Sequence, residues 1–236
     1  MPLLSGTERH MPRAVCFDLY GTLIDISIDT NLDGLWESLF HDFTLSSRYR
    51  TPAELHARYD ALVQRDRQRN GEAFVLDSGL FSDLLGVGPG DIAVREFGRE
   101  FRRLSTVQVQ LRPYAAELLQ RMREYGAKLA IVSNTEQTVT GYDLDQLDLV
   151  RHFDTVVLSS VVGARKPDAA IFQVAMDRLG VAADECVFVG DDYVCDFRGA
   201  EAVGMRPVLL CTGRHPTGVP CVPAEVHALI EAICSS

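Results

Sequence analysis

The sequence predicts an α/β fold in which a parallel sheet is covered by helices on both faces. Three observations lead to this prediction. Short apolar runs alternate with helical segments in the second half of the chain, the runs are continuously apolar, and several of them end directly in polar residues. Strands that alternate with helices form parallel sheets, because each parallel connection needs a crossover. Continuous apolar runs are typical of strands that are buried on both faces.

The elements of this core can be placed along the chain. The expected strands are residues 14–17, 128–132, 155–158, 186–189 and 208–211. The expected helices are residues 114–125, 167–179 and 223–233. Gly180 follows the second of these helices, at the position where glycine commonly ends a helix. In sheets of this kind ligands bind beyond the carboxyl ends of the strands.

The segment after the first expected strand has a different pattern. Its apolar residues recur at spacings of three and four, which predicts helices. Thr51, Pro52 and Glu54 suit the N-cap, first and third positions of a helix. The segment contains no convincing strand. The expected organisation is therefore a core of residues 1–25 and 111–236 with an inserted helical domain of residues 26–110.

Composition and charge limit the function. The 236 residues are 47% hydrophobic, which is enough to bury a core, and carry a formal net charge of -10. Because an acidic protein repels a phosphate backbone, we expect no nucleic-acid partner. No apolar run approaches the ~20 residues of a membrane span, and the first ten residues contain no apolar signal segment. We therefore expect a cytoplasmic protein without a membrane partner.

The six cysteines form no CxxC pair and no cluster with zinc-like spacing. Cys16 and Cys186 lie in apolar, strand-like runs. We expect the cysteines to be buried apolar side chains in a reducing cytosol.

Polar residues follow three of the expected strands. They are Asp18, then Ser133 with Asn134, then Asp191 with Asp192. The carboxyl ends of parallel strands meet at one edge of the sheet, so these side chains should share one crevice. Carboxylates that meet there repel one another unless cations offset them, and Lys166 together with a divalent metal would do so. Ligation by oxygen alone favours Mg²⁺ over zinc.

Four motifs in this order resemble those of the haloacid dehalogenase superfamily. They are FDLYGTL at 17–23, VSN at 132–134, RKPD at 165–168 and VGDDYVCD at 189–196. The resemblance implies a Rossmann-like core with a helical cap domain inserted after the first motif. It also implies a hydrolase that acts on a small molecule, and a phosphorylated metabolite is the leading substrate class.

The resemblance implies roles for the site residues. Asp18 would attack the substrate and form a covalent aspartyl intermediate that water then hydrolyses. Thr22 and Ser133 would hydrogen-bond the transferred group, and Lys166 would stabilise its charge. Asn134 completes the second motif. The implied Mg²⁺ ligands are Asp18, the carbonyl of Tyr20 and Asp191, with Asp192 or Asp196 supporting the metal or its waters.

The first motif departs from the phosphatase pattern at Tyr20. Phosphatases of this superfamily usually carry a second Asp there, which acts as general acid and base. A Tyr at this position resembles the 2-haloacid dehalogenases, which need no metal. The acidic fourth motif, with Asp191, Asp192 and Asp196, favours a Mg²⁺-dependent phosphatase. Two alternatives stay open: a metal-free 2-haloacid dehalogenase, and a catalytically weak binding or regulatory protein of the same fold.

Overall fold

The computed structural model describes residues 11–70, 78–213 and 215–235. The chain forms two compact units, which are described separately. The first, here called the core unit, comprises Met1–Asp25, Gln110–Ser133 and Val150–Ser236. The second, here called the helical unit, comprises Ile26–Val109 and Asn134–Leu149.

The core unit is built on a five-stranded parallel sheet in the order β5-β4-β1-β6-β7. The strands are β1 (Ala14–Phe17), β4 (Lys128–Ser133), β5 (Thr155–Leu158), β6 (Cys186–Gly190) and β7 (Arg206–Leu209). β1 is central, with Ala14 paired to Lys128 on one side and to Cys186 on the other. All four residues of β1 are fully buried, as its continuous apolar sequence predicts.

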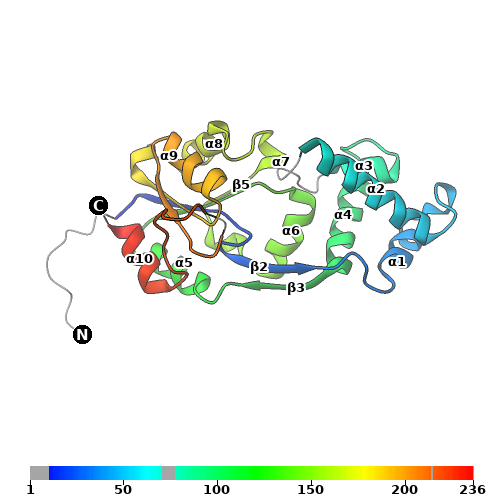
Figure 1. Cartoon of the computed structure of the whole chain (residues 1–236), viewed down its shortest axis with the longest axis horizontal. Helices are drawn as coiled ribbons and strands as arrows, with labels where there is room; N and C mark the ends of the chain where they lie inside the picture. The colour runs from blue at the N-terminus through cyan, green and yellow to red at the C-terminus, as the bar shows by residue number, and fades with distance from the viewer. Residues whose placement is uncertain (1–10, 71–77, 214, 236) are drawn as a thin grey trace. The chain divides into compact units, whose positions relative to one another are not determined.

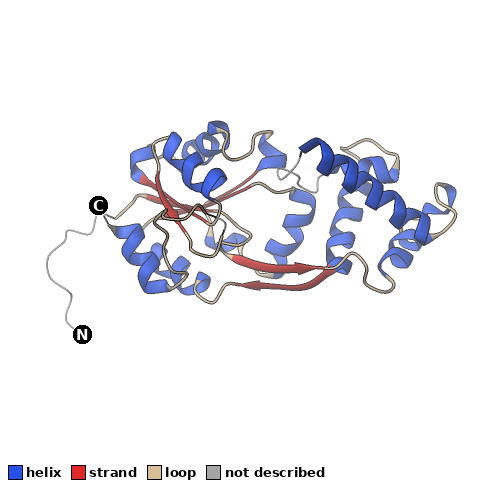
Figure 2. Ribbon diagram, viewed as in Figure 1, coloured by secondary structure: helices blue, strands red, loops and turns tan. Residues whose placement is uncertain are grey.

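Helices cover both faces of this sheet, as Figures 1 and 2 show. α8 (Ala169–Leu179) packs on β4 and β5, and α9 (Gly199–Ala202) packs on α8 and β7. On the opposite face, α5 (Ala115–Glu124) packs on β4 and on α10 (Val226–Cys234). Shorter elements of the unit are η3 (Val150–His152), α7 (Ser159–Val162), η4 (Ala183–Glu185) and the π-helical turn η5 (Tyr193–Arg198). Cys16 and Phe188 belong to the cluster of buried residues that contains Phe172 of α8. The predicted fold class is therefore confirmed.

Element ends differ slightly from the expected ones where local caps decide them. α8 begins at Ala169 rather than at Pro167, because the Asp168 carboxylate accepts a hydrogen bond from the backbone of the first turn. It ends at the expected Gly180, which has a φ of 65°. β7 lies two residues before the expected range.

The described residues of the helical unit form five main helices and one short turn. They are α1 (Leu35–Asp42), η1 (Leu45–Ser47), α2 (Pro52–Asn70), α3 (Ser78–Leu85), α4 (Ile92–Ser105) and α6 (Gln137–Gln146). α2 begins at Pro52 as expected, and the Thr51 hydroxyl accepts a hydrogen bond from the backbone N–H of Glu54 at 3.2 Å. The core of the unit is rich in aromatic rings, and the Tyr59 ring lies 5.0 Å from Trp36 and 5.2 Å from Phe101.

Residues 134–149 belong to the helical unit and not to the core, where the expected boundaries place them. α6 packs on α4. The Arg102 guanidinium lies 3.2 Å from an Asp143 carboxylate oxygen, and both side chains are buried. At Gly98 the two helices approach so closely that a Cβ would lie 2.3 Å from the Thr138 side chain. Burial of this ion pair and close helix packing thus attach the segment to helices distant in sequence.

Two strands occur where the sequence analysis expects none. β2 (Ile24–Ile28) and β3 (Thr106–Leu111) pair as a separate two-stranded sheet and lie side by side in Figure 1. Each strand contains a point at which the chain passes from one unit to the other. Their sequences, IDISI and TVQVQL, alternate apolar and polar residues with the period of a strand. The expectation that this segment lacks strands is therefore wrong.

The cysteines also differ from the expectation. Cys211 and Cys221 form a disulfide with their Cα atoms 5.1 Å apart. Cys16, Cys186 and Cys234 are buried free thiols, as expected, and Cys195 is half-buried. Burial raises the pKa of the Cys186 thiol to about 11. Disulfide pairing depends on the distance and direction of two Cβ atoms, which sequence spacing does not give.

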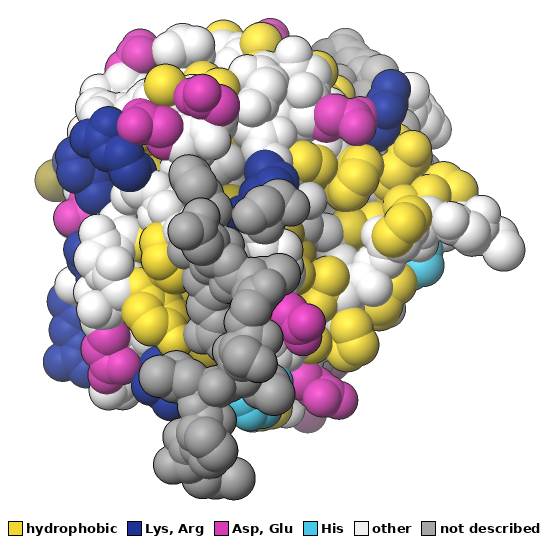
Figure 3. Space-filling model, turned by 90° about the vertical axis from the view of Figure 1, so that its left-hand side faces the viewer, with side chains coloured by type: hydrophobic (Ala, Val, Ile, Leu, Met, Phe, Trp, Pro, Cys, Tyr) yellow, Lys and Arg dark blue, Asp and Glu magenta, His cyan; other side chains and the backbone are white. Residues whose placement is uncertain are grey.

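The surface shown in Figure 3 carries acidic, basic and apolar side chains intermixed. In the ranges that the structure describes, every helix is too short or too polar to cross a bilayer.

Candidate active site

The predicted site residues of the core unit meet at the carboxyl edge of the sheet. Asp18 directly follows β1, Ser133 ends β4, and Asp191 directly follows β6. β4 and β6 are the two neighbours of β1, which brings these three positions together. The backbone N–H of Asp18 donates to the carbonyl of Val189 at 2.9 Å, so the sheet ladder continues up to this carboxylate.

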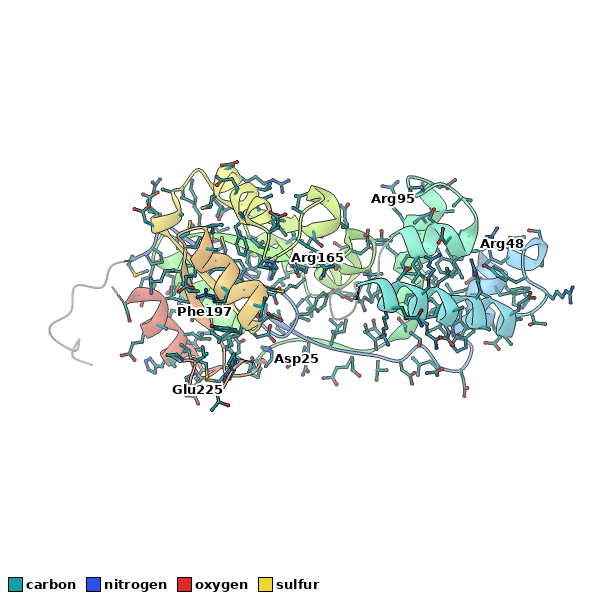
Figure 4. All side chains as sticks on the ribbon, turned by 45° about the horizontal axis from the view of Figure 1, so that its top comes forward. Asp25, Arg48, Arg95, Arg165, Phe197 and Glu225 are labelled. Carbon is teal, nitrogen blue, oxygen red and sulfur yellow. A yellow bond between two sulfur atoms is a disulfide. The ribbon has the colours of Figure 1, made fainter. Side chains whose placement is uncertain are left out.

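Lys166 is the buried cation of the site. Its Nζ lies 2.7 Å from Asp18 Oδ1 and 2.6 Å from Asp196 Oδ1. It also lies 5.3 Å from the centre of the Phe188 ring. Burial alone would lower the pKa of Lys166, but the carboxylates of Asp18 and Asp196 outweigh it and raise this pKa. The lysine is therefore a fixed positive charge. Figure 4 labels Arg165, which precedes it in the same loop.

Asp196 joins the lysine to the loop after β6. Its Oδ1 accepts the hydrogen bond from Lys166, and its Oδ2 accepts backbone N–H groups of Asp191 at 3.1 Å and Asp192 at 3.0 Å. The residue is only 2% exposed. Both oxygens of Asp196 are thus engaged by donors of the protein, an arrangement that holds Lys166 and the Asp191 backbone in place.

Three carboxylates form an acidic cluster around this lysine. Asp18, Asp191 and Asp196 place carboxylate oxygens within 4.8 Å of one another. Gly21, with a φ of 85°, lets the first loop approach, since a Cβ there would lie 2.3 Å from Asp191 Oδ2. Burial, followed by the charges of Asp18 and Asp196, raises the pKa of Asp191 to about 7. The cluster therefore holds more negative than positive charge when all its groups are ionised.

Two hydroxyls complete the edge. The buried Ser133 hydroxyl donates to Asp18 Oδ1 at 3.4 Å. Thr22 is fully buried, and its hydroxyl has no hydrogen-bond partner within the described ranges of the chain. A buried hydroxyl in this state is costly, which makes Thr22 a candidate to bind a group brought by the substrate.

Asp192 lies outside the acidic cluster. Its Oδ1 accepts backbone N–H groups of Val194 at 2.8 Å and Cys195 at 2.7 Å, which caps η5. In the same turn the rings of Tyr193 and Phe197 stack at 5.6 Å, and Figure 4 labels Phe197. Of the two carboxylates that the sequence leaves undecided, Asp196 is thus the one in the cluster.

Tyr20 and Asn134 follow Asp18 and Ser133 in the chain and are not part of the acidic cluster. Tyr20 is half-buried and forms a backbone bridge to Ile24, within the tight loop that follows Asp18. Asn134 is also half-buried and is the first residue of the second segment of the helical unit, directly after Ser133.

One residue at this edge was not predicted from the sequence. The Tyr114 hydroxyl donates to the carbonyl of Thr22, and Tyr114 is buried. Burial raises the pKa of this hydroxyl, so it stays a donor. Nothing in the pattern around Pro113 marks this contact, because it joins residues 92 positions apart.

Comparison with known proteins agrees with the motifs. A family model of haloacid dehalogenase-like hydrolases matches residues 12–204. A phosphoglycolate phosphatase of Xanthomonas campestris pv. campestris is 30% identical over 205 residues, which are 86% of this chain and 85% of that protein. Haloacid dehalogenase-like hydrolase domain-containing protein 3 of Mus musculus is 42% identical over 92 residues, or 39% of this chain.

The extent of these matches differs. The chain spans 36% of the mouse protein and less than half of several other curated relatives that it matches. Among solved structures, a HAD phosphatase from Thermococcus onnurineus has a TM-score of 0.62 with 25% identity, covering 92% of this chain and 95% of that one. This similarity extends over both units.

Proposed function

Because the chain belongs to the haloacid dehalogenase-like hydrolases, we propose that it is a Mg²⁺-dependent phosphatase of a small phosphorylated metabolite. The observation that carries the proposal is the acidic cluster of Asp18, Asp191 and Asp196 around Lys166. A relative that matches most of the chain is named a phosphoglycolate phosphatase, which supports small phosphorylated acids as the first substrates to assay.

The residues of the cluster fit a magnesium ion. The three Asp side chains offer carboxylate oxygens, which are ligands that Mg²⁺ prefers. Burial and the surplus of negative charge raise the pKa of Asp191, and binding of a cation would offset that charge. Asp18, Asp191 and the Tyr20 carbonyl would hold the ion. Asp196 would support them through its hydrogen bonds with Lys166 and the Asp191 backbone, and Asp192 would do so by capping the turn that carries Asp196. When bound, Mg²⁺ would offset charge on the phosphoryl oxygens.

The protein's own residues would carry the reaction. A carboxylate oxygen of Asp18 would attack phosphorus, and the bond from phosphorus to the ester oxygen would break. The leaving oxygen would take a proton from solvent to form the alcohol, and water would then hydrolyse the aspartyl-phosphate to phosphate and free Asp18. Lys166, held by Asp196, keeps a positive charge 2.7 Å from the nucleophile and stabilises charge on the transferred group. The Ser133 and Thr22 hydroxyls donate to the same oxygens, and Tyr114 fixes the backbone of Thr22.

We assign substrate selection to the helical unit. Its longest segment is inserted directly after the loop of Asp18, and its second segment begins directly after Ser133. Insertion at these two points supports a cap that consists of residues 26–109 and 134–149, with Asn134 as its link to the second motif.

A metal-free dehalogenase is the competing function, and Tyr20 is the residue that favours it. Dehalogenation needs no metal ligand at Asp191, and the half-buried carboxylate of Asp191 would then only repel those of Asp18 and Asp196. The acidic cluster therefore supports the phosphatase.

The test is an activity screen of phosphorylated metabolites, beginning with phosphoglycolate, and of 2-haloacids, each with Mg²⁺ and with EDTA. We expect phosphate release that requires Mg²⁺ and is lost in Asp191→Ala. Halide release that persists in EDTA would replace the proposal with the dehalogenase. No turnover, together with no trapping of beryllofluoride on Asp18, would instead indicate a binding protein.

A further inference from the structure

The Cys211–Cys221 disulfide closes the loop after β7, and residues 210–213 of this segment lie beside Gly21, Gly190 and Asp191. The two cysteines are ten positions apart. Leu210, just before the loop, donates its backbone N–H to the carbonyl of Gly190 at 2.8 Å, next to Asp191. The disulfide is therefore joined to the same strand end that carries the candidate metal ligand.

Two residues beside Cys211 reach the site directly. The Thr212 hydroxyl donates to the carbonyl of Gly21 at 3.5 Å. Gly213 lies very close to Asp191. A Cβ added to Gly213 would be 1.7 Å from the carbonyl oxygen of Asp191 and 2.8 Å from the Cβ of Asp191. On the other side, a Cβ on Gly21 would be 2.3 Å from the Asp191 carboxylate. Asp191 is thus enclosed between Gly21 and Gly213.

The base of the loop is held without the disulfide. The backbone N–H of Cys211 donates to Val222 at 3.0 Å, and that of Val222 donates to Leu209 at 2.7 Å. These bonds would keep β7 in place if the sulfurs separated. The change on reduction should therefore be confined to the loop itself, including the Thr212 and Gly213 contacts.

We propose that the Cys211–Cys221 disulfide is a redox-sensitive clamp that fixes Asp191 for cation binding. With the disulfide closed, Thr212 and Gly213 stay in contact with Gly21 and Asp191. These contacts fix the Asp191 carboxylate in position before a cation binds. With the bond open, the loop gains freedom and Asp191 loses this support. The proposal rests on the proposed function in one respect, namely that the bound cation is Mg²⁺.

The chemistry of the switch is thiol–disulfide exchange with a dithiol reductant. A thiolate of the reductant attacks one sulfur and forms a mixed disulfide. Its second thiol then displaces that bond, so the reductant becomes a cyclic disulfide while Cys211 and Cys221 take up two electrons and two protons as thiols. Cys211 is exposed and Cys221 half-buried, so the reductant can reach the bond. A disulfide in a cytosolic enzyme is commonly of this redox-active kind.

The test compares Mg²⁺ affinity of the oxidised and reduced protein by titration calorimetry. We expect Kd to be weaker by about tenfold after reduction, the lower end of what loss of a supporting contact costs a metal site. The double variant Cys211→Ser/Cys221→Ser should bind as the reduced protein does, with or without dithiothreitol. Cys195→Ser, which removes another accessible thiol, should respond to reduction like the wild type. Equal affinities of oxidised and reduced wild type would overturn the clamp.

A second measurement separates this proposal from the function itself. Amide hydrogen exchange of the peptides around Gly21 and Asp191 should be faster in the reduced wild type, with no metal added. If neither form binds Mg²⁺, the proposed function fails while the exchange data still decide on the clamp, and unchanged exchange would reject it. Gly213→Ala keeps both cysteines but pushes the loop from Asp191, so it should weaken Mg²⁺ binding even when oxidised.

Discussion

Each unit contains a group of buried charged side chains, but the two groups differ in the ratio of positive to negative charges. In the core unit, Lys166 contacts Asp18 and Asp196, and Asp191 adds a third carboxylate to the group. In the helical unit, Arg102 pairs with Asp143. Each cluster joins segments that lie far apart in the sequence, and apart from the half-buried Asp191 all of these side chains are buried.

The difference in balance indicates a difference in role. The buried charges of Arg102 and Asp143 are opposite and equal, so this pair serves to hold α4 and α6 together. Three carboxylates around one lysine are incomplete, and their mutual repulsion is relieved when a cation binds. Surplus buried charge is tolerated at functional sites because binding a ligand restores the balance. The following predictions test this comparison, from the largest expected effect to the smallest.

Removing the nucleophile from the unbalanced cluster should abolish turnover without unfolding the protein. For Asp18→Asn we expect kcat to fall by about 10⁵–10⁶-fold, as when a nucleophile is lost. The melting temperature should not fall, because one of three repelling carboxylates is removed. Steady-state kinetics and thermal melting check both statements, with the exposed Asp184→Asn as control. A variant that keeps more than about a tenth of the activity would contradict the mechanism.

Removing one partner of the balanced pair should destabilise the fold. Arg102→Met removes the guanidinium that pairs with the buried Asp143 carboxylate and should cost about 3–5 kcal/mol in the free energy of unfolding. Urea unfolding measures it, and the double variant Arg102→Met/Asp143→Leu should recover most of the loss.

The same two helices offer a matched control for that prediction. Arg99 and Asp145 also pair across α4 and α6 at 3.1 Å, but both side chains are at least half exposed. Arg99→Met should cost less than about 1 kcal/mol, as exposed pairs do. Equal costs for Arg99→Met and Arg102→Met would show that burial is not what gives the inner pair its importance.

Tyr20 leaves the core site without a carboxylic acid two residues after the nucleophile. The wild type should therefore favour phosphates with good leaving groups, such as aryl phosphates. Tyr20→Asp supplies an acid and should raise turnover of alkyl phosphates by about 10²-fold or more, with little effect on aryl phosphates. The measurement is kcat against leaving-group pKa, with Tyr20→Phe as control. If kcat of the wild type does not depend on leaving-group pKa and is unchanged in Tyr20→Asp, then a group other than residue 20 supplies the proton.

Mg²⁺ binding should depend on pH, because the pKa of Asp191 is raised to about 7. Below this pH the proton competes with the ion, so Kd should weaken by about tenfold per pH unit. In the native protein without Mg²⁺, Asp191 keeps its proton up to about pH 7. In the unfolded chain, the same carboxyl group releases its proton near the ordinary pKa of an aspartate. Stability from this group is therefore present at low pH and is lost as pH rises towards about 7.

Calorimetry and thermal melting from about pH 5 to about pH 8 measure both effects. Mg²⁺ should raise the melting temperature more at the alkaline end. The Asp191→Asn variant should lose both dependences. An affinity that stays constant through this range would mean that Asp191 does not hold the ion.

The sequence by itself determined the core and the edge at which the site lies. Buried parallel strands are continuously apolar, so β1, β4, β5 and β6 could be located from short runs of residues. Since such strands share one carboxyl edge, the residues after them, Asp18, Ser133 and Asp191, were predicted to converge, and they do. The alternating pattern of β2 and β3 was also present in the sequence, but the surrounding residues have the spacing of helices and the whole segment was predicted to be helical.

The tertiary structure alone decided the features that depend on contacts between distant residues. Asp196 rather than Asp192 joins the acidic cluster, because a π-helical turn directs one carboxylate to Lys166 and the other to backbone N–H groups. Residues 134–149 join the helical unit through the Arg102 and Asp143 pair. The Cys211–Cys221 bond likewise follows from Cβ positions that the loop geometry sets. Local periodicity specifies each element and its buried face, whereas these contacts arise only when the faces pack together.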